Sequence, residues 1–198
     1  MIERIHIAIA ESAEDLRDVF RLRHRVLVEE EGYYPESTEG LIHTVFDAYP
    51  SSVNLLARVG EEAAASVRVT FDSGVGLPWD RLGDLACLRD SVEEPAVALG
   101  MLVCTRRYRA KRSMLIALLR AAAHLIHERS CVHMFAAVNP EFAPSLERMG
   151  FNQVGSTTRI GGFDNDVVPM HGRIDRLRPP FDRHFAPRPA VRVLKDAA

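Results

Sequence analysis

The spacing of hydrophobic positions changes several times along the first half of the chain, and each change marks an expected boundary between elements. Apolar residues partly alternate over 2–9, which predicts a first strand. Between the N-cap candidate Ser12 and Gly32 they recur at helical spacing, which predicts a helix. Two strand-forming runs, 53–59 and 65–71, are separated by a short glycine-containing turn and predict a hairpin.

The second half opens with a continuous apolar run over 96–104, which is typical of a fully buried strand. A long helix is expected next over 113–129, and then a strand over 133–138. A second helix is expected from Asn139 to the turn at Gly150. The last two strands, 151–159 and 167–174, are expected to form an antiparallel pair across Gly161-Gly162. The polar segment 33–46 is expected to be a loop with a short helix, and 72–95 to be irregular. This order predicts an α/β (α+β) fold with a mixed sheet and helices on both faces.

Length and composition fit one globular domain over 1–178, followed by an extended tail over 179–198 that is rich in Pro and Arg. Lys and Arg number 25 against 27 Asp and Glu, and this near-neutral balance argues against a dedicated nucleic-acid-binding protein. The longest apolar stretch, 114–126, is broken by Arg120 and His124, so no integral membrane segment is expected.

Cys87, Cys104 and Cys131 lie far apart, which favours neither a disulfide framework nor a metal site. Nothing near the chain start has the layout of a secretion signal, so a cytoplasmic location is expected. Two histidines on the long helix have a spacing found in metal sites, but no acidic or thiol ligand nearby completes a set, so no metal is predicted.

The segment 106–112 carries five cations in seven residues, follows the buried strand and leads directly into the long helix. A helix N-terminus presents unpaired N–H groups and the positive end of the helix dipole, and arginine side chains add bidentate phosphate contacts. The placement favours phosphate binding. The alternative is a loop of solvated cations.

This strand, loop and helix resemble the GNAT N-acyltransferase fold, in which an R/Q-x-x-G-x-G/A loop binds the pyrophosphate of coenzyme A. The resemblance implies a mostly antiparallel sheet splayed near its centre. It also implies donor contacts from the loop residues and from backbone N–H groups at the splay: Arg109, Ala110, Lys111, Arg112, Ser113 and Met114 in the loop, and Leu102, Val103 and Cys104 in the strand. Two of these positions, Arg112 and Met114, carry large residues where the family has small ones. This difference favours a phosphopantetheine donor on an acyl carrier protein over acyl-CoA.

The segment Leu22-Arg23-His24-Arg25-Val26-Leu27-Val28-Glu29-Glu30-Glu31-Gly32-Tyr33 resembles the L-R-x-x-V-F-x-E-x-x-G-W/Y motif of LuxI-type autoinducer synthases and FeeM-type N-acyl amino acid synthases. Further along the chain, Asp47 stands where these families place an acidic residue, and Ser66-Val67-Arg68 resembles their small-x-Arg strand. Asn139-Pro140 and Leu146-Glu147-Arg148-Met149-Gly150-Phe151 resemble the closing segments of FeeM-like sequences. The shared order of these motifs, over about residues 15–175, is more specific than any one of them.

Two family features are missing. The E-x-S-R motif of the synthases reads Ala98-Leu99-Gly100-Met101, and the tyrosine with which many GNAT enzymes protonate the thiol falls at Leu146. A thiol has a pKa of about 8.5 and can leave as thiolate, so the second loss leaves the chemistry intact.

The resemblance leaves Asp47 and Glu30 as candidate general bases for the acceptor amine. The alternative for Asp47 is that it caps a helix or turn. The alternative for Glu30 is that it lies on a solvent-exposed helix face. Arg23 and Arg68 could bind the carboxylate of an amino-acid acceptor. The alternative is that both arginines lie at the surface and face solvent.

The expected function is transfer of an acyl group from an acyl carrier protein or coenzyme A thioester to a small amine acceptor, with an amino acid favoured. Acyl-phosphopantetheine or acyl-CoA would then be a co-substrate, with no permanently bound cofactor. The competing hypothesis is a catalytically silent module that binds an acyl carrier or another protein.

Overall fold

The computed structural model describes residues 5–80, 82–110, 112–159 and 166–182. Eight strands form its sheet: β1 (Ile5–Ile9), β2 (Ser52–Val59), β3 (Glu62–Phe71), β4 (Ala96–Cys104), β5 (His133–Val138), β6 (Asn152–Gln153), β7 (Thr158–Arg159) and β8 (Asp166–Arg173). The strand order is β1-β2-β3-β4-β5-β8-β6, with β7 also pairing with β8. Every pair is antiparallel except β4–β5, so the predicted mixed, mostly antiparallel sheet is confirmed.

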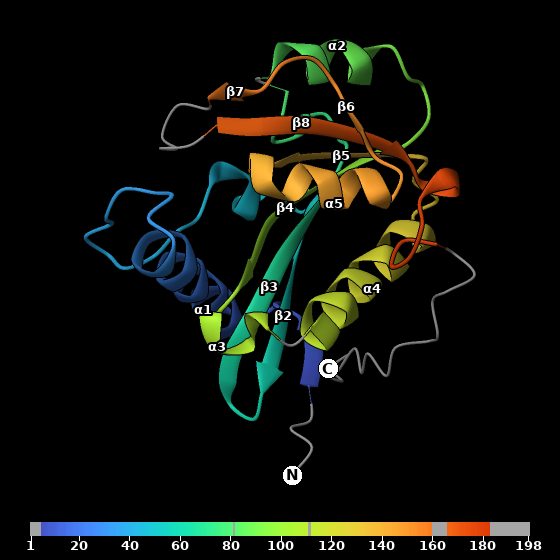
Figure 1. The fold of residues 1–198 in the computed structure, drawn as a ribbon. Helices are drawn as coiled ribbons and strands as arrows, with labels where there is room; N and C mark the ends of the chain where they lie inside the picture. Colours follow the sequence, from blue (N-terminus) through green and yellow to red (C-terminus); the bar gives the residue numbers. More distant parts are fainter. Residues whose placement is uncertain (1–4, 81, 111, 160–165, 183–198) are drawn as a thin grey trace.

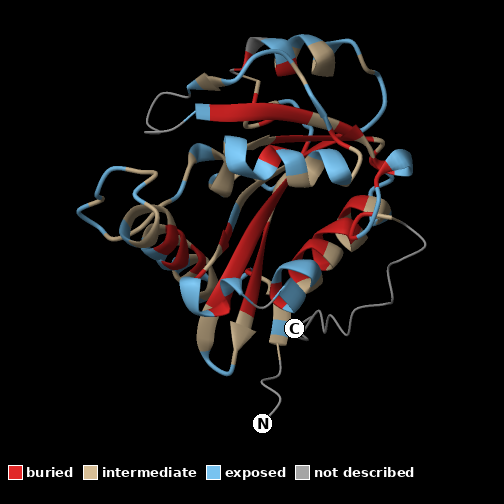
Figure 2. Cartoon of the chain, viewed as in Figure 1, coloured by how far each residue is buried: buried red, intermediate tan, exposed pale blue. Residues whose placement is uncertain are grey.

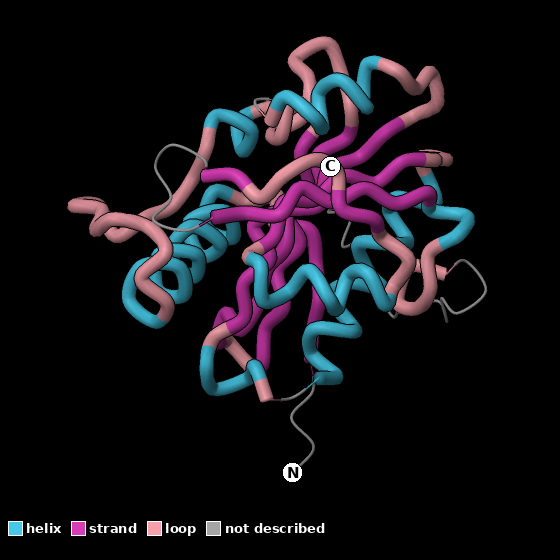
Figure 3. The backbone as a smooth tube through the Cα atoms, turned by 45° about the horizontal axis from the view of Figure 1, so that its top comes forward, coloured by secondary structure: helices cyan, strands magenta, loops and turns pink. Residues whose placement is uncertain are grey.

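Helices cover both faces of this sheet (Figures 1 and 3). The α-helices are α1 (Ala13–His24), α2 (Gly83–Asp90), α3 (Arg106–Arg109), α4 (Arg112–Glu128) and α5 (Ala143–Arg148). Shorter turns are the π-helix η1 (Arg25–Glu30) and the 3-10 segments η2 (Val45–Ala48), η3 (Pro140–Phe142) and η4 (Ile174–Arg176). In Figure 1, α1 and α4 stand on opposite sides of β2 and β3, and α2 lies beyond β8.

Alternate residues along each strand enter different hydrophobic clusters, as the pleat of a strand requires. Val67 and Val69 of β3 pack with α4 and α5 in the main core. Leu56 and Val103 pack with α1, whereas Ala98 and Phe135 pack in a cluster that includes Leu85 of α2: Leu77, Trp79, Leu82, Leu85, Ala96, Ala98, Phe135 and Val167. The buried strands and inner helix faces meet in the middle of Figure 2. Because Arg68 alternates with the two valines, its side chain lies on the α1 face.

The structure differs from the sequence-based expectation in several elements. The first helix changes to π-helical geometry at Arg25 and ends at Glu30. The irregular segment before β4 contains α2, whose apolar pattern is too weak to have identified it. The predicted strand 151–159 is two separate two-residue strands. The turn expected at Gly161-Gly162 lies outside the described residues.

The folded core extends into the predicted tail. Phe181 is buried, and its ring lies 6.0 Å from that of Phe151. Its carbonyl oxygen lies 2.9 Å from Nε2 of His127 on α4. The first residues after 178 therefore belong to the packed domain, whereas 183–198 lie outside the described residues. No helix in the described part of the chain is long and apolar enough to cross a membrane.

Candidate active site

A buried carboxylate joins three elements at the α1 face of the sheet. Oδ1 of Asp47 accepts hydrogen bonds from Nη1 of Arg23 (2.9 Å) and Nδ2 of Asn54 (3.2 Å). Its Oδ2 accepts from Nη1 of Arg68 (2.9 Å) and from the Thr44 N–H (2.8 Å). The side chains of Arg23, Arg68 and Asp47 are 0%, 2% and 3% exposed. The surface positions considered for the two arginines are therefore wrong.

Local sequence explains why this carboxylate points inward. Asp47 is the third residue of η2, where it accepts from the Thr44 backbone and receives the reciprocal contact of a capping box. The capping alternative is confirmed. Arg23 lies on the inner face of α1, and Asn54 pairs with Arg68 across β2 and β3.

Two guanidinium groups share this one carboxylate, so the cluster carries an excess positive charge. Burial by itself would raise the pKa of Asp47, but the charges of Arg23 and Arg68 and the Thr44 N–H outweigh burial and hold the pKa below its usual range. A carboxylate that stays ionised and fully hydrogen-bonded is a poor proton acceptor. The geometry fits a residue that holds the two arginines in place, rather than the predicted base.

Nearby, Tyr34 is half-buried, and its pKa is raised chiefly by burial. Tyr34, Thr44 and Asn54 were not identified from the sequence. Only Thr44 carried a usable signal, through its N-cap spacing to Asp47.

The carboxylate of Glu30, the second candidate base, is paired with arginine side chains. Its Oε2 accepts from the Arg106 N–H (2.8 Å) and lies 3.3 Å from Nη2 of Arg109. Its Oε1 lies 3.5 Å from Nε of Arg25, and Arg109 also pairs with Glu31. Glu30 therefore ties the end of η1 to the first turn after β4, and Arg109 is not a free cation.

The remaining donor-loop residues differ in exposure. Arg112 and Ser113 are exposed in the first turn of α4, whereas the Met114 side chain is fully buried and offers only its backbone. No carboxylate among the described residues pairs with Arg112. Lys111 lies outside the described residues, and Ala110 follows α3 directly.

The sheet opens between β4 and β5. Their parallel pairing ends at Leu99 opposite Ala136, and β4 then has an irregularity at Met101, whose φ is +50°. The predicted splay at Leu102–Cys104 is thus placed too late, because the strands separate directly after Leu99. A bulge explains both the early separation and the strained backbone.

β4 and the helices that follow β4 and β5 carry exposed apolar side chains. Four large hydrophobic residues on them are each at least 37% exposed: Leu102 of β4, Leu115 and Ile116 of α4, and Phe142 of η3. Exposed apolar residues of this kind can contact an apolar ligand.

Trp79 is a further residue at the opening that the sequence did not identify. A methyl group at Gly100 would lie 3.1 Å from its Cζ2, so only glycine fits there without a shift. Its indole N–H is buried and has no partner among the described residues.

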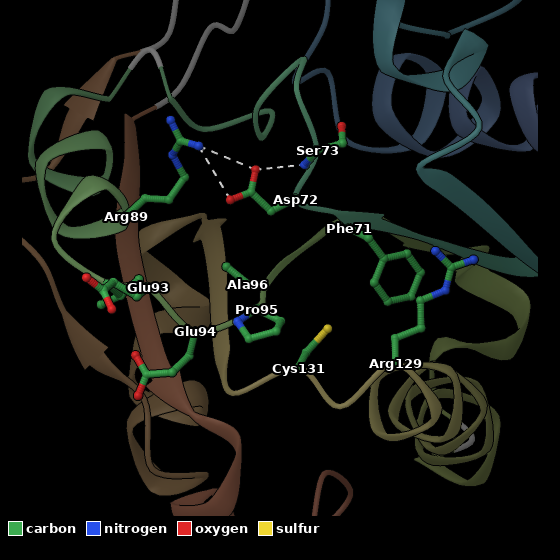
Figure 4. A pocket seen from close by; sticks show the side chains of 11 residues that line it. Phe71, Asp72, Ser73, Arg89, Glu93, Glu94, Pro95, Ala96, Arg129 and Cys131 are labelled. Atoms are coloured by element: carbon green, nitrogen blue, oxygen red, sulfur yellow. Dashed lines mark hydrogen bonds and ion pairs between the residues drawn. The ribbon is translucent and has the colours of Figure 1, made fainter.

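A shallow depression of about 480 Å³ lies at the other end of β4 (Figure 4). Arg129 stacks over Phe71 on one side of it, and Arg89 pairs with Asp72 on the other. None of the predicted site residues lines it. It is therefore separate from the opening between β4 and β5.

A second polar cluster joins β5 and β8. Nδ1 of His133 lies 2.9 Å from Nε2 of His171, and Nε2 of His133 lies 3.3 Å from Glu94. Burial and the charges of His133 and Arg173 lower the pKa of His171 to about 4. Within the described ranges, no three His, Cys, Asp or Glu side chains gather as a metal site.

The His171 side chain predicts a specific acid sensitivity. Between pH 6.5 and about 4, this histidine takes up a proton in the unfolded chain but stays neutral in the fold. The fold therefore loses stability as the pH falls through that range. The loss amounts to about 3 kcal/mol at most over that range. Chemical denaturation at pH 7 and pH 5 should show a shallower dependence for His171→Gln than for wild type. His6→Gln, at an exposed position, should leave the profile unchanged. Parallel profiles for His171→Gln and wild type would contradict the prediction.

Comparison with known proteins adds to this geometry. A family model described as FeeM, N-acyl amino acid synthase, matches residues 18–173. No sequence among curated proteins matches the chain. Several solved structures share the fold.

The structure of FeeM, an N-acyl amino acid synthase from uncultured soil microbes, is 16% identical, with a TM-score of 0.73 over 86% of this chain and 91% of that one. The CoA-dependent acyl-homoserine lactone synthase BjaI is 17% identical, with a TM-score of 0.68 over 89% and 85%. The AHL synthase LasI is 13% identical, with a TM-score of 0.65 over 88% and 95%. These matches confirm the GNAT-like fold.

Proposed function

Because the chain belongs to the FeeM family of N-acyl amino acid synthases and is thus an N-acyltransferase, we propose that it acylates the amino group of an amino acid. The observation that carries this proposal is the buried pair Arg23 and Arg68, which share the single carboxylate of Asp47. An acceptor carboxylate would balance the excess charge of this cluster.

The position of Arg68 supports this assignment. It pairs in register with Gly100, one residue beyond the last β4–β5 pair. A carboxylate bound to Arg68 would therefore place the neighbouring amino group close to the opening of the sheet. The Nε atoms of Arg23 and Arg68 are buried and make no hydrogen bond to any described residue.

The donor would lie in the opening itself. The amine nitrogen attacks the thioester carbonyl, the C–N bond forms, the C–S bond breaks, and the thiolate leaves with the electron pair. The amine loses one proton, and the thiolate gains one. We assign stabilisation of the oxyanion to the segment Leu102–Cys104 of β4, through those of its backbone N–H groups that point away from β3. The exposed apolar side chains of β4, α4 and η3 would contact the acyl chain.

We assign the donor phosphate to the backbone at the start of α4, at Arg112, Ser113 and Met114, together with Lys111. Ala110 and Arg109 complete the loop, but Arg109 is partly neutralised by Glu30 and Glu31. The surplus of cations suits an acidic acyl carrier protein, and coenzyme A is the second candidate donor.

The proposal is tested by measuring free thiol release from acyl carrier and acyl-CoA thioesters over a panel of amino acids and simple amines. Turnover that depends on an amino acid, with formation of the N-acyl amino acid by mass spectrometry, is the expected result. Ala98, Met101 and Leu146 stand where related enzymes carry charged residues or tyrosine, so the transfer would proceed without those groups. Thioester binding without turnover on any amino acid would overturn the proposal.

The donor-loop assignment makes a separate prediction. Lys111→Ala combined with Arg112→Ala should raise the donor KM about tenfold and weaken its salt dependence, because two phosphate-binding cations are removed. Arg107→Ala serves as the matched control, since Arg107 already pairs with Glu62. A donor KM unchanged in the double variant would defeat the assignment.

A further inference from the structure

The segment between η1 and the following loop is attached to the end of β4. Glu30 accepts from the Arg106 N–H (2.8 Å), and Nη2 of Arg106 donates back to the Glu30 carbonyl oxygen (2.9 Å). Arg109 binds Glu30 and Glu31. This side of the segment is thus held by at least three contacts to α3, the first turn after β4.

Three residues after Glu30, the same segment contacts the end of β5 through Tyr33. The Tyr33 hydroxyl donates to Oε1 of Glu141 in η3, the turn that follows β5, at 3.0 Å. Asn139, the residue directly after β5, also hydrogen-bonds the phenol. Partial burial and Glu141 raise the pKa of Tyr33, so the phenol stays protonated and remains a donor. One tyrosine hydroxyl therefore makes this attachment.

These two attachments span the opening of the sheet. Only three peptide bonds separate Glu30 from Tyr33, a reach of at most about 11 Å along the backbone. Gly32, with φ of +67°, turns the chain between them, and the Tyr33 N–H donates to the Leu27 carbonyl (2.7 Å). The segment is therefore short and anchored at its base. It crosses from the end of β4 to the end of β5, where the two strands no longer pair.

The two ends differ in strength. The β4 end has charge-assisted contacts from two arginines, whereas the β5 end depends on one exposed tyrosine hydroxyl and its hydrogen bonds to Glu141 and Asn139. The β5 end is thus the weaker attachment, and it is the end expected to release first.

We propose that residues 30–33 form a strap across the opening between β4 and β5, and that the Tyr33–Glu141 hydrogen bond is its latch. The latch opens to admit the thioester arm of the donor and closes behind it. This inference rests on the proposed function, because it requires a donor in the opening. Tyr33 is a positioning residue: it holds the strap over the arm and takes no part in bond formation.

The test measures binding and not turnover. The probes are 2-oxoalkyl thioethers of coenzyme A and of 4′-phosphopantetheine, which carry a carbonyl but cannot transfer an acyl group. Tyr33→Phe should raise the dissociation rate of the bound probe at least fivefold, because the phenol loses its hydrogen bonds to both Glu141 and Asn139. Glu141→Ala removes only one of these bonds and should raise the rate less, and the double variant should equal Tyr33→Phe. Glu147→Ala, at an exposed position on α5, is the matched control and should leave the rate unchanged.

Hydrogen exchange of the free protein gives an independent measurement. Amides of residues 31–34 should exchange about fivefold faster in Tyr33→Phe than in wild type, while those of α4 stay unchanged. Equal probe dissociation from wild type and Tyr33→Phe would overturn the latch while leaving the proposed function intact. Failure of wild type to bind either probe would overturn both the donor assignment and the latch.

Discussion

Asp47→Ala is expected to lower the free energy of unfolding by about 3–5 kcal/mol, because it leaves two buried guanidinium groups without their shared carboxylate. A loss of this size is a large fraction of the stability of a typical domain. Urea denaturation followed by circular dichroism measures it. Asp18→Ala is the matched control, since Asp18 pairs with Arg58 at a partly exposed position, and its removal should cost about 1 kcal/mol or less.

If Asp47→Ala does not fold, the double variant Asp47→Ala/Arg23→Met should recover part of the lost stability, because one uncompensated charge is removed. An Asp47→Ala protein within about 1 kcal/mol of wild type would contradict the buried cluster. The pH dependence has a defined sign. The pKa of Asp47 is lower in the fold than in the unfolded chain, so its contribution is present above the unfolded pKa and is lost as the pH falls through the folded one.

Arg68→Met is expected to lower kcat/KM for an amino acid acceptor by about 10–100-fold while changing stability little. The acceptor carboxylate loses a charge-assisted hydrogen bond worth about 1.5–3 kcal/mol, whereas Arg23 and Asp47 remain as a balanced pair. Arg68→Lys keeps the charge but loses the planar guanidinium, whose Nη1 bonds both Thr44 and Asp47 and whose other nitrogens could bind the acceptor, so it should be impaired to an intermediate degree. Steady-state kinetics with varied acceptor concentration measures both variants.

A decarboxylated acceptor provides the internal comparison. Wild type should use the corresponding amine poorly, and Arg68→Met should not reduce that rate further, because the interaction is already absent. Arg58→Met, which removes another strand arginine, should leave acceptor kinetics unchanged. Equal wild-type rates with the amino acid and its amine would contradict the role of Arg68.

Strong local patterns predicted most of the fold. Strand-forming runs, a continuous apolar run and the long apolar helix identified β2 to β5 and α4, because elements buried in a core are rich in apolar side chains. Weak patterns failed: α2 has a small apolar face, and the two short strands before β8 are stabilised by pairing with it. The splay of the sheet was expected, but its start after Leu99 was missed, because a bulge depends on the register of neighbouring strands.

For the candidate site, the order of motifs along the chain was sufficient to select Arg23, Asp47 and Arg68, and the threonine cap was readable from its spacing. The sequence could not decide whether these charges face water or the interior, since an arginine on a helix or strand has the same local pattern in both cases. That choice depends on how α1 packs over β2 and β3, which brings residues 23, 47, 54 and 68 together from distant parts of the chain. Likewise, only the tertiary structure places Tyr33 beside Glu141, because a contact across 108 positions depends on where the strands end and not on local sequence.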